Sequence, residues 1–589
     1  MSPHARARPT KPSTWPFFRH FTKISFLSLM LLSLSVLEFG FDNSITSLVQ
    51  VMDQFDVDFH MYLPLNETEP THHHGTRAHE GSHSNSSSSS NGTHHHGHPQ
   101  MDPVKLSIFG SIGTPFRAGM LFVALLIAER WGRWAVFVVM QFGSLLGATI
   151  LFTAHSFVQV VCGRVVLTMF SGWHDWLIPM YLAEIVPGPV RGSVIAFYMI
   201  FSYSGSVTAA LATFFCSRAY VDDARQYRIP FALMWITPAV CLSLCWVLPE
   251  SPRWLVRKGR MDDAVRALRR LNGTKNGYSP EEEAKLLLAS IEEDAATQGA
   301  WRDLFRGTNT RRTLIVFMSI FIISFTGQSF VTKYGTIFVK GIGAMDPLQF
   351  GLMEKSLSII APLTLLFVID RFGRRTIYFV NAVVYAVCLF LIGGIGMMDV
   401  HRVGNVIITL YILSAIVHII GYHGACTVVA AETPHLRLRE RTLTVTHIAS
   451  NIVEFGVSFS LPYLLYKPYA DLESKVGFIY GTISILGIVW GYFYLPDTSR
   501  RSLEELEELW QAGVPAYKFG SYKTTGSGVG FRVTQLERHA GAGELGSSSE
   551  DLPQATSLHG TVESGKADSD ILDKGVAVVH EEVVMPEKV

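Results

Sequence analysis

The sequence predicts an all-α membrane protein, in which twelve transmembrane helices form two six-helix bundles with a cytosolic helical domain between them. Three observations lead to this fold class. Of the 589 residues, 48% are hydrophobic and only 17% are charged, and the mean hydropathy of +0.26 is too high for a soluble protein of this length. Apolar runs long enough to cross a bilayer, about 20 residues each, recur along the chain. Charged motifs also repeat between the two halves.

The composition excludes several classes of protein. Lys plus Arg and Asp plus Glu number 49 each, so no net charge points to a nucleic-acid partner. The six cysteines lie in or beside apolar runs, where they serve as small packing residues, without disulfide or zinc spacing. The sequence therefore argues against a nucleic-acid-binding protein, a disordered scaffold and a soluble enzyme, and it predicts neither a cofactor nor a structural metal.

Twelve apolar runs, bounded by charged or Gly/Pro-rich turns, define the predicted helices in chain order. They cover residues 24–50, 105–128, 134–154, 157–182, 193–216, 229–248, 313–338, 352–369, 376–397, 403–430, 441–466 and 476–495. The first run follows a basic N-terminus as a signal peptide would. It lacks a small-residue cleavage site and eleven more spans follow, so we interpret it as a retained helix.

The loops predict the orientation of the spans. Short basic loops mark the cytoplasmic face of a membrane protein, and here they all fall on one side, together with both termini. These basic segments are 130–133, Arg191, 253–270, 371–375 and 437–441. The opposite, outer side carries three glycosylation sequons, at Asn66, Asn85 and Asn91. We therefore expect a multi-pass protein, most simply of the plasma membrane.

Five regions follow from this topology. They are a cytosolic segment 1–23, a first bundle 24–248 that includes the outer loop 53–104, a cytosolic helical linker domain 249–312, a second bundle 313–495, and a mostly disordered cytosolic tail 496–589. The outer loop is rich in His and Ser and cannot form a core. We expect it to be solvated and glycosylated, with metal or pH sensing as the alternative.

Three motifs recur at a nearly constant distance, which indicates an internal repeat of six spans. Glu129 and Asp370 are 241 positions apart, and Glu184 and Glu432 are 248 apart. PESPRWL at 249–255 likewise corresponds to PDTSRRSLEEL, which begins 247 positions later. Each motif places a carboxylate near arginines at a cytoplasmic helix end.

We interpret these charges as ion pairs that latch the two bundles on the inner side and break when the protein opens inward. The alternative is that they only satisfy helix ends and the basic bias of cytoplasmic loops. The residues of this set are Glu129, Arg133, Glu184, Arg191, Glu250, Arg253, Asp370, Arg374, Arg375, Glu432, Arg437 and Arg439.

With these motifs the chain resembles the sugar porter family of the major facilitator superfamily over about residues 25–510. The matching text includes FGFD at 39–42, ERWGR at 129–133, PMYLAEI at 179–185 and DRFGRR at 370–375, together with the two repeated Pro-acid motifs. The resemblance implies the major facilitator fold, alternating access between two bundles, and a midplane site for hexoses, pentoses, polyols or related solutes.

Asp42 and Arg164 match the acid and arginine that couple proton uptake to conformational change in symporters of this family. The chemistry fits this role. A carboxylate beside a guanidinium stays ionised, and separating the two leaves it desolvated and ready to take up a proton. Facilitators of the family carry similar residues, so uniport remains the alternative to symport.

The sugar pocket departs from the family pattern. Met199, Ser324, Ser329 and Thr427 stand where the family has sugar-contacting amide or Trp side chains, and Glu454 replaces an Asn. Amides suit sugar hydroxyls because they donate and accept hydrogen bonds. The full set of candidate pocket residues is Met199, Ser324, Gln328, Ser329, Lys333, Thr427, Glu454, His174 and Asp175. We therefore expect a solute other than ordinary glucose.

Charged residues at membrane depth take the place of these amides. Lys333, Glu454, His174 and Asp175 are joined by Glu38, which lies one helical turn before Asp42. Either they form buried pairs, Lys333 with Glu454 and His174 with Asp175 or Glu38, or they contact a charged solute or a proton. The cargo would then be an acid, an amine or a decorated polyol. Arg117 matches no family motif that we can place.

The sequence thus predicts a secondary transporter for a sugar-like solute, coupled to protons, monomeric in the lipid bilayer, and not an enzyme. Two other classes remain as alternatives. A non-transporting sensor would use the long tail for signalling, and a metal transporter would use the outer His tracts.

Overall fold

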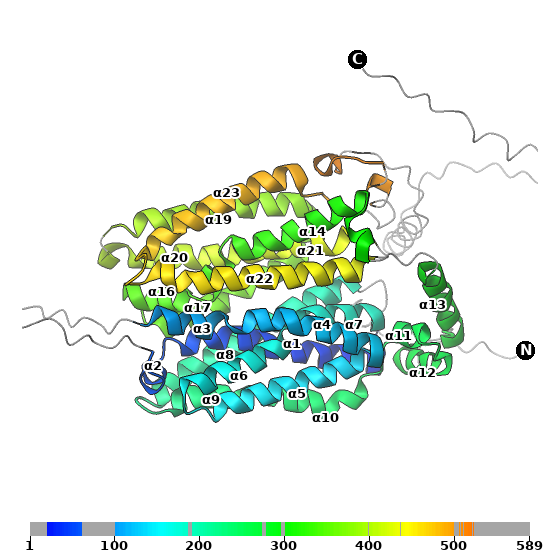
Figure 1. Ribbon diagram of the computed structural model, residues 1–589, viewed down its shortest axis with the longest axis horizontal. Coiled ribbons are helices and arrows are strands. Elements are labelled where there is room, and N and C mark those ends of the chain that lie inside the picture. The colour runs from blue at the N-terminus through cyan, green and yellow to red at the C-terminus, as the bar shows by residue number, and fades with distance from the viewer. Residues whose placement is uncertain are drawn as a thin grey trace, which may run out of the picture. The chain divides into compact units, whose positions relative to one another are not determined.

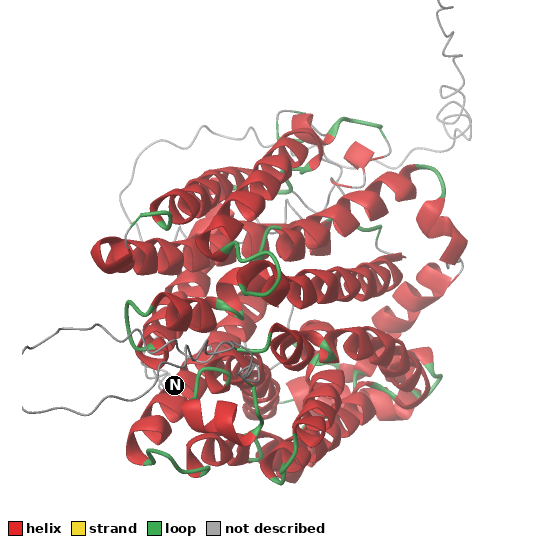
Figure 2. Ribbon diagram, turned by 60° about the vertical axis from the view of Figure 1, so that its left-hand side comes forward, coloured by secondary structure: helices red, strands yellow, loops and turns green. Residues whose placement is uncertain are grey.

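Helices make up the regular structure of this protein. The computed structural model describes residues 21–61, 101–186, 191–273, 278–295, 301–398, 400–435, 438–499, 506, 508–510, 512–520 and 522, and within these ranges there is no β-strand (Figure 2). The three sequon asparagines, Arg437 and most of the tail lie outside the described residues. Arg191 and Asp370 lie in described helices, but their side chains are not described.

The first half of the chain contains six spans, labelled in Figure 1. They are α1 (Lys23–Val49), α3 (Pro103–Ser111) continued by α4 (Gly113–Trp131), α5 (Arg133–Phe152), α6 (Phe157–Ser171) continued by α7 (His174–Ile185), α8 (Arg191–Ala219), and α9 (Arg225–Leu233) continued by α10 (Ile236–Leu244). A short helix, α2 (Asp53–Asp58), follows the outer end of α1.

The second half repeats this pattern. Its spans are α14 (Thr308–Phe325) continued by α15 (Gln328–Thr332) and α16 (Gly335–Ile342), α17 (Pro347–Ser358) continued by α18 (Ile360–Phe372), α19 (Arg374–Ile395), α20 (Val400–His418) continued by a π-helical turn (Ile419–Ala425) and α21 (Cys426–Glu432), α22 (Arg439–Leu465), and α23 (Val476–Tyr494). All twelve predicted spans are therefore helical.

Ten helical segments of the described chain are long and apolar enough to cross a membrane. The two predicted spans outside that set are broken. The span 157–182 is interrupted between α6 and α7, and the span 313–338 is interrupted at Gly327, which has a φ of 94°, and again at Lys333. Broken helices at membrane depth occur where protein or a cavity, rather than lipid, surrounds the freed backbone. Both breaks lie beside the candidate site.

Close backbone packing joins α1 to α8. A Cβ added at Gly40 would lie 1.7 Å from the carbonyl oxygen of Ser202, and one at Gly205 would lie 2.0 Å from that of Leu37. The two halves meet along α22, which packs on α3 and α4, and along α17 and α18, which pack on α8 (Figure 1). The candidate site lies between the halves at the first of these contacts.

The linker domain contains α11 (Pro252–Arg257), α12 (Met261–Asn272) and α13 (Pro280–Ala295), which pack around Trp254 and Ala264. The Ser25 hydroxyl donates to the Leu271 carbonyl at 2.7 Å and so ties α12 to the start of α1. The first part of the predicted tail is not free of the bundle. Its apolar residues Leu506, Leu509, Trp510, Val514 and Phe519 form a cluster with Ile315 of α14.

Candidate functional site

Asp42 and Arg164 form a buried ion pair inside the first half. Asp42 lies on α1 with a side chain only 1% exposed, and its Oδ1 accepts a hydrogen bond from Arg164 Nη1 on α6. The Ser171 hydroxyl, two turns further along α6, donates to Asp42 Oδ2 at 2.7 Å. Each carboxylate oxygen of Asp42 thus accepts one hydrogen bond from a residue of α6.

A second charged network crosses from one half to the other. Glu454 on α22 accepts from Arg117 Nη2 of α4 at 2.6 Å and from Lys333 Nζ at 2.7 Å. Arg117 also donates from Nε to the amide oxygen of Asn451, one turn before Glu454, at 3.0 Å. The predicted pair of Lys333 and Glu454 is therefore present, and the second cation of the network is Arg117, for which the sequence suggested no role.

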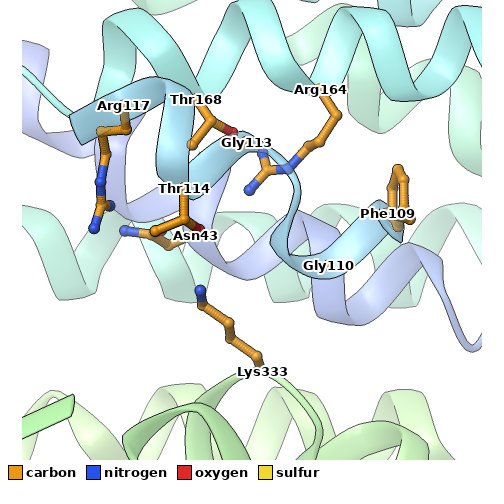
Figure 3. Close-up of a pocket in the computed structure, with 9 residues that line it drawn as sticks. All are labelled: Asn43, Phe109, Gly110, Gly113, Thr114, Arg117, Arg164, Thr168 and Lys333. Atoms are coloured by element: carbon orange, nitrogen blue, oxygen red, sulfur yellow. The ribbon is translucent and has the colours of Figure 1, made fainter. Parts of the chain in front are cut away.

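These two networks border one pocket, shown in Figure 3. Its lining residues come from α1, the α3–α4 segment, α6 and the end of α15: Asn43, Phe109, Gly110, Gly113, Thr114, Arg117, Arg164, Thr168 and Lys333. Arg117 and Arg164 approach the space from the first half and Lys333 approaches it from the second (Figure 3). The pocket thus combines cationic, hydroxyl and amide side chains with one aromatic ring.

Glu38 and His174 face each other behind Asp42. His174 is fully buried, its Nδ1 lies 2.7 Å from the Ser171 carbonyl oxygen, and its Nε2 lies 3.9 Å from Glu38 Oε2. Within the described part of the chain, neither oxygen of Glu38 meets a donor in hydrogen-bond geometry. Asp175 takes no part in this pair, because it is exposed and accepts from the Tyr198 hydroxyl. Of the two partners that the sequence left open for His174, the structure brings Glu38 to it.

Most of the other candidate pocket residues lie away from the lining. Met199 is packed in the apolar cluster of the first half, and the hydroxyls of Ser324 and Ser329 face Ser450 and Ser458 of α22. Gln328 and Thr427 are half-buried and do not line the pocket. Of the predicted set, the pocket wall includes Lys333, together with Arg164 of the coupling pair.

Sequence reasoning missed the polar part of the lining. Asn43 directly follows Asp42, Thr114 precedes Arg117 by three positions, and Thr168 follows Arg164 by four. Residues three or four apart share one helix face, so helical spacing from the charged residues would have found Thr114 and Thr168, but not Asn43. Phe109 carries no comparable signal.

The repeated cytoplasmic motifs occupy equivalent places in the two halves. Arg133 pairs with Glu184 at 3.2 Å in the first half, and Arg374 pairs with Glu432 at 3.1 Å in the second. The latch between the bundles that we expect from these charges stays a prediction. The two ion pairs of Arg133 and Arg374 each join helices of the same half. Each pair stays within one half because its two residues lie at the ends of neighbouring helices of the same six-span repeat.

The repeated glycines show the same correspondence. Gly132 and Gly373 have φ values of 100° and 85°, and a Cβ there would lie 2.2 Å from Glu250 and 3.3 Å from Asp497 respectively. Glu250 Oε1 accepts the backbone N–H of Arg133 at 2.9 Å and so caps α5. Burial raises the pKa of Glu250, while the N–H groups that donate to it act in the opposite direction.

The remaining members of this charged set lie at the same helix ends. Glu129 is exposed, and its carbonyl accepts from the Trp254 indole at 3.2 Å. Arg375 donates to the Tyr492 carbonyl at 2.7 Å. Arg253 and Arg439 lie at the start of α11 and α22. The set therefore marks one end of both bundles, the end that the sequence predicts to be cytoplasmic.

At the outer side the two halves are joined directly. Lys340 of α16 donates to Asp53 Oδ1 at 3.0 Å, to Asp56 Oδ2 at 2.9 Å and to the Val51 carbonyl at 3.0 Å. The Thr336 hydroxyl donates to the Ser47 carbonyl at 2.8 Å. These contacts close the space between α1 and α16 above the pocket.

The sequence of this chain is similar to those of known transporters. A family model described as "Sugar (and other) transporter" matches residues 28–510. An alpha-glucosides permease of Saccharomyces cerevisiae is 28% identical over 395 residues, which cover 64% of each chain. A maltose permease of the same yeast is 29% identical over 388 residues, which cover 64% of this chain and 62% of the permease. The chain thus spans less than two thirds of the length of these relatives.

Solved structures of the xylose transporter XylE have a similar fold. One, described as the proton:xylose symporter bound to 6-bromo-6-deoxy-D-glucose, has a TM-score of 0.63 at 19% identity and covers 82% of this chain and 99% of that one. An inward-open structure from Escherichia coli has a TM-score of 0.61 at 19% identity, covering 82% and 100%. The likeness confirms the predicted all-α fold of two six-helix bundles.

Proposed function

Because this chain belongs to the sugar transporter family of the major facilitator superfamily, we propose that it is a proton-coupled secondary transporter of a sugar-like solute. The observation that supports the proposal best is the buried pair of Asp42 and Arg164, which borders the pocket between the halves. An ionisable pair at membrane depth is costly and is kept where it has a function. We place the protein in the plasma membrane as a monomer that carries solute and performs no enzymatic chemistry.

The pair can couple a proton to the solute in four steps. With the pocket open to the outside, Asp42 takes up a proton and releases Arg164. The solute then binds among the side chains that line the pocket, and the halves rearrange to open inward. On the inner side Arg164 returns to Asp42 and the proton leaves. Ser171 can remain hydrogen-bonded to Asp42 throughout, because a hydroxyl serves either protonation state of the acid.

Alternating access requires contacts between the halves that form and break. The outer contacts of Lys340 and Thr336 are of this kind, and so is the ion pair between Arg117 and Glu454 at the depth of the pocket. Because the described cytoplasmic ion pairs lie within one half, we infer that they keep each bundle rigid while the two move.

Uptake by purified protein in proteoliposomes tests the proposal. We expect an inward pH gradient to drive accumulation of a cargo from a panel of sugars, polyols and sugar acids. Asp42→Asn should abolish the gradient dependence while exchange of cargo across the membrane survives. Asp223→Asn is a suitable control because Asp223 is a loop residue paired with the exposed Arg225.

The other outcomes distinguish the alternatives. Uptake by the unmodified protein that does not depend on the pH gradient would indicate a uniporter. Unchanged stimulation in Asp42→Asn would remove Asp42 from the mechanism. Binding of a cargo without any flux, in a protein that inserts and folds normally, would favour the sensor.

A further inference from the structure

Three cationic side chains line the pocket between the halves. Arg117, Arg164 and Lys333 are all part of its wall, and none of its nine lining residues is acidic (Figure 3). Two carboxylates outside the lining form ion pairs with these cations. Asp42 pairs with Arg164, and Glu454 pairs with both Arg117 and Lys333. The lining and its ion-pair partners therefore carry one more positive charge than negative.

Neighbouring carboxylates outside this set form no described ion pair with the cations of the lining. Lys355, whose ammonium donates to the Thr332 carbonyl at 3.1 Å, is matched by Glu354 at 2.7 Å. Glu38 faces His174, and Asp175 accepts from the Tyr198 hydroxyl. An uncompensated charge away from bulk water is unfavourable by several kcal/mol, so a pocket of this kind favours an anion.

The hydrogen-bonding pattern points in the same direction. Among the described residues, Arg164 donates one hydrogen bond, to Asp42, Arg117 donates from Nε and Nη2 but not from Nη1, and Lys333 donates to Glu454 alone. Thr168 Oγ1 is buried without a partner at the same wall. The pocket is thus rich in donors, whereas recognition of a neutral sugar needs donors and acceptors in balance.

We propose that the cargo is a sugar acid, a polyhydroxylated solute with one carboxylate, which is a refinement that rests on the transport function proposed above. The carboxylate would accept from Arg117 and Lys333, sharing them with Glu454. An arginine fork binds a carboxylate through two parallel bonds. The hydroxyls of the cargo would meet Asn43, Thr114 and Thr168.

This cargo also accounts for coupling to the proton. When Asp42 is protonated, Arg164 becomes a second uncompensated cation in the wall, and the affinity for an anion rises. By linkage, a bound anion favours proton uptake at Asp42 to the same extent. One proton and one monoanion cross together, so the transported charge is zero.

Matched solutes test the proposal directly. D-galacturonate and D-galactose differ by a carboxylate in place of a hydroxymethyl group, and galacturonate is ionised at neutral pH. We expect galacturonate to bind at least tenfold more tightly, measured by the thermal stabilisation of purified protein. Equal or tighter binding of galactose would overturn the proposal, as would no binding of galacturonate.

The charge that accompanies transport provides a second readout. In proteoliposomes with a fixed pH gradient, uptake of galacturonate should be unaffected when valinomycin and potassium set the membrane potential. Uptake that follows the potential would contradict one-to-one movement of a proton and a monoanion. If galactose accumulates with the gradient and galacturonate does not, the anionic cargo is wrong while proton-coupled transport stands. If neither galacturonate nor galactose is taken up, with or without the pH gradient, the proposed transport function itself is wrong.

Two substitutions should shift galacturonate affinity in opposite directions. Arg117→Gln removes a cation and should raise the dissociation constant at least tenfold, whereas Glu454→Gln removes the competing carboxylate and should lower it. Arg260→Gln, on an exposed arginine that pairs with Asp263 within the linker domain, is the control. Loss of binding in both variants, when both remain folded, would show that the network is structural and would overturn the assignment.

Discussion

A single carboxylate, that of Glu454, holds two cations that belong to different halves of the protein. The side chains of Arg117 and Lys333 are 14% and 23% exposed, so water screens them only partly. Removing the shared partner of such a network leaves like charges side by side, which costs more than losing the bonds alone.

We therefore predict that Glu454→Gln destabilises the protein by about 1–3 kcal/mol, seen as a lower thermal midpoint in detergent without added cargo. Lys333→Met introduced together with Glu454→Gln should recover part of this loss, because only Arg117 then needs a partner. A double-mutant cycle with the two single variants measures this coupling. Strictly additive effects would contradict a shared anion.

Some residues of the candidate site could be predicted from the sequence, and others could not. Asp42 and Arg164 could be predicted because they stand in family motifs, and Lys333 and Glu454 because charges in apolar runs are conspicuous. The partner of Arg117 could not, since it lies 337 positions away on another helix. Met199 was a poor candidate for a physical reason, because its thioether fills the apolar core of the first half.

Among the helices, the contact of α1 with α8 depends on the absence of two side chains. Gly40 and Gly205 bring the backbones together at the level of Glu38 and Asp42. Main-chain packing thus fixes α1, the helix that carries Asp42, and positions this residue against α6.

Gly40→Ala should force α1 and α8 apart, because the added methyl would overlap the Ser202 carbonyl. Overpacking of this kind costs about 1–3 kcal/mol, so we expect a lower thermal midpoint and weaker proton-coupled uptake. Gly119→Ala in α4 is the matched control, since open space surrounds that position. A variant as stable as the control would show that α1 and α8 tolerate separation.

The helices themselves were predictable where apolar runs are continuous, and less so where they break. The interruptions at Gly327 and Lys333 lie inside the single span predicted over 313–338, although polar residues flank both positions. They arise from tertiary packing, with Tyr480 against Gly327 and with Glu454 holding Lys333. The packing of the early tail on α14 was missed because its apolar residues are scattered among polar ones.

At the scale of the whole molecule, the described ion pairs between the halves lie at the pocket and at the end of the bundles predicted to be outer, whereas α17 and α18 add packing contacts with α8. Lys340 makes three hydrogen bonds to the segment that follows α1. The sequence predicted two equivalent bundles from its repeat, but it could not predict which ends of the bundles touch, because that depends on the conformation adopted.

Lys340→Ala should weaken the outer closure and expose the pocket to the outside more often. We expect a cysteine placed at Asn43, in a Cys162→Ser background, to react several times faster with an impermeant thiol reagent added outside. Lys105→Ala is the control, because Lys105 contacts His60 within the first half. Equal reaction rates in the two variants would show that Lys340 does not hold the outer side closed.

The central claim, that each cargo molecule enters with a proton by way of Asp42, is tested most directly by recording internal pH in proteoliposomes as cargo is added outside. At equal starting pH on both sides, addition of the best cargo should acidify the interior by one proton per molecule taken up. Asp42→Asn should exchange cargo without acidification. Uptake without acidification in the unmodified protein, or unchanged acidification in Asp42→Asn, would contradict the account.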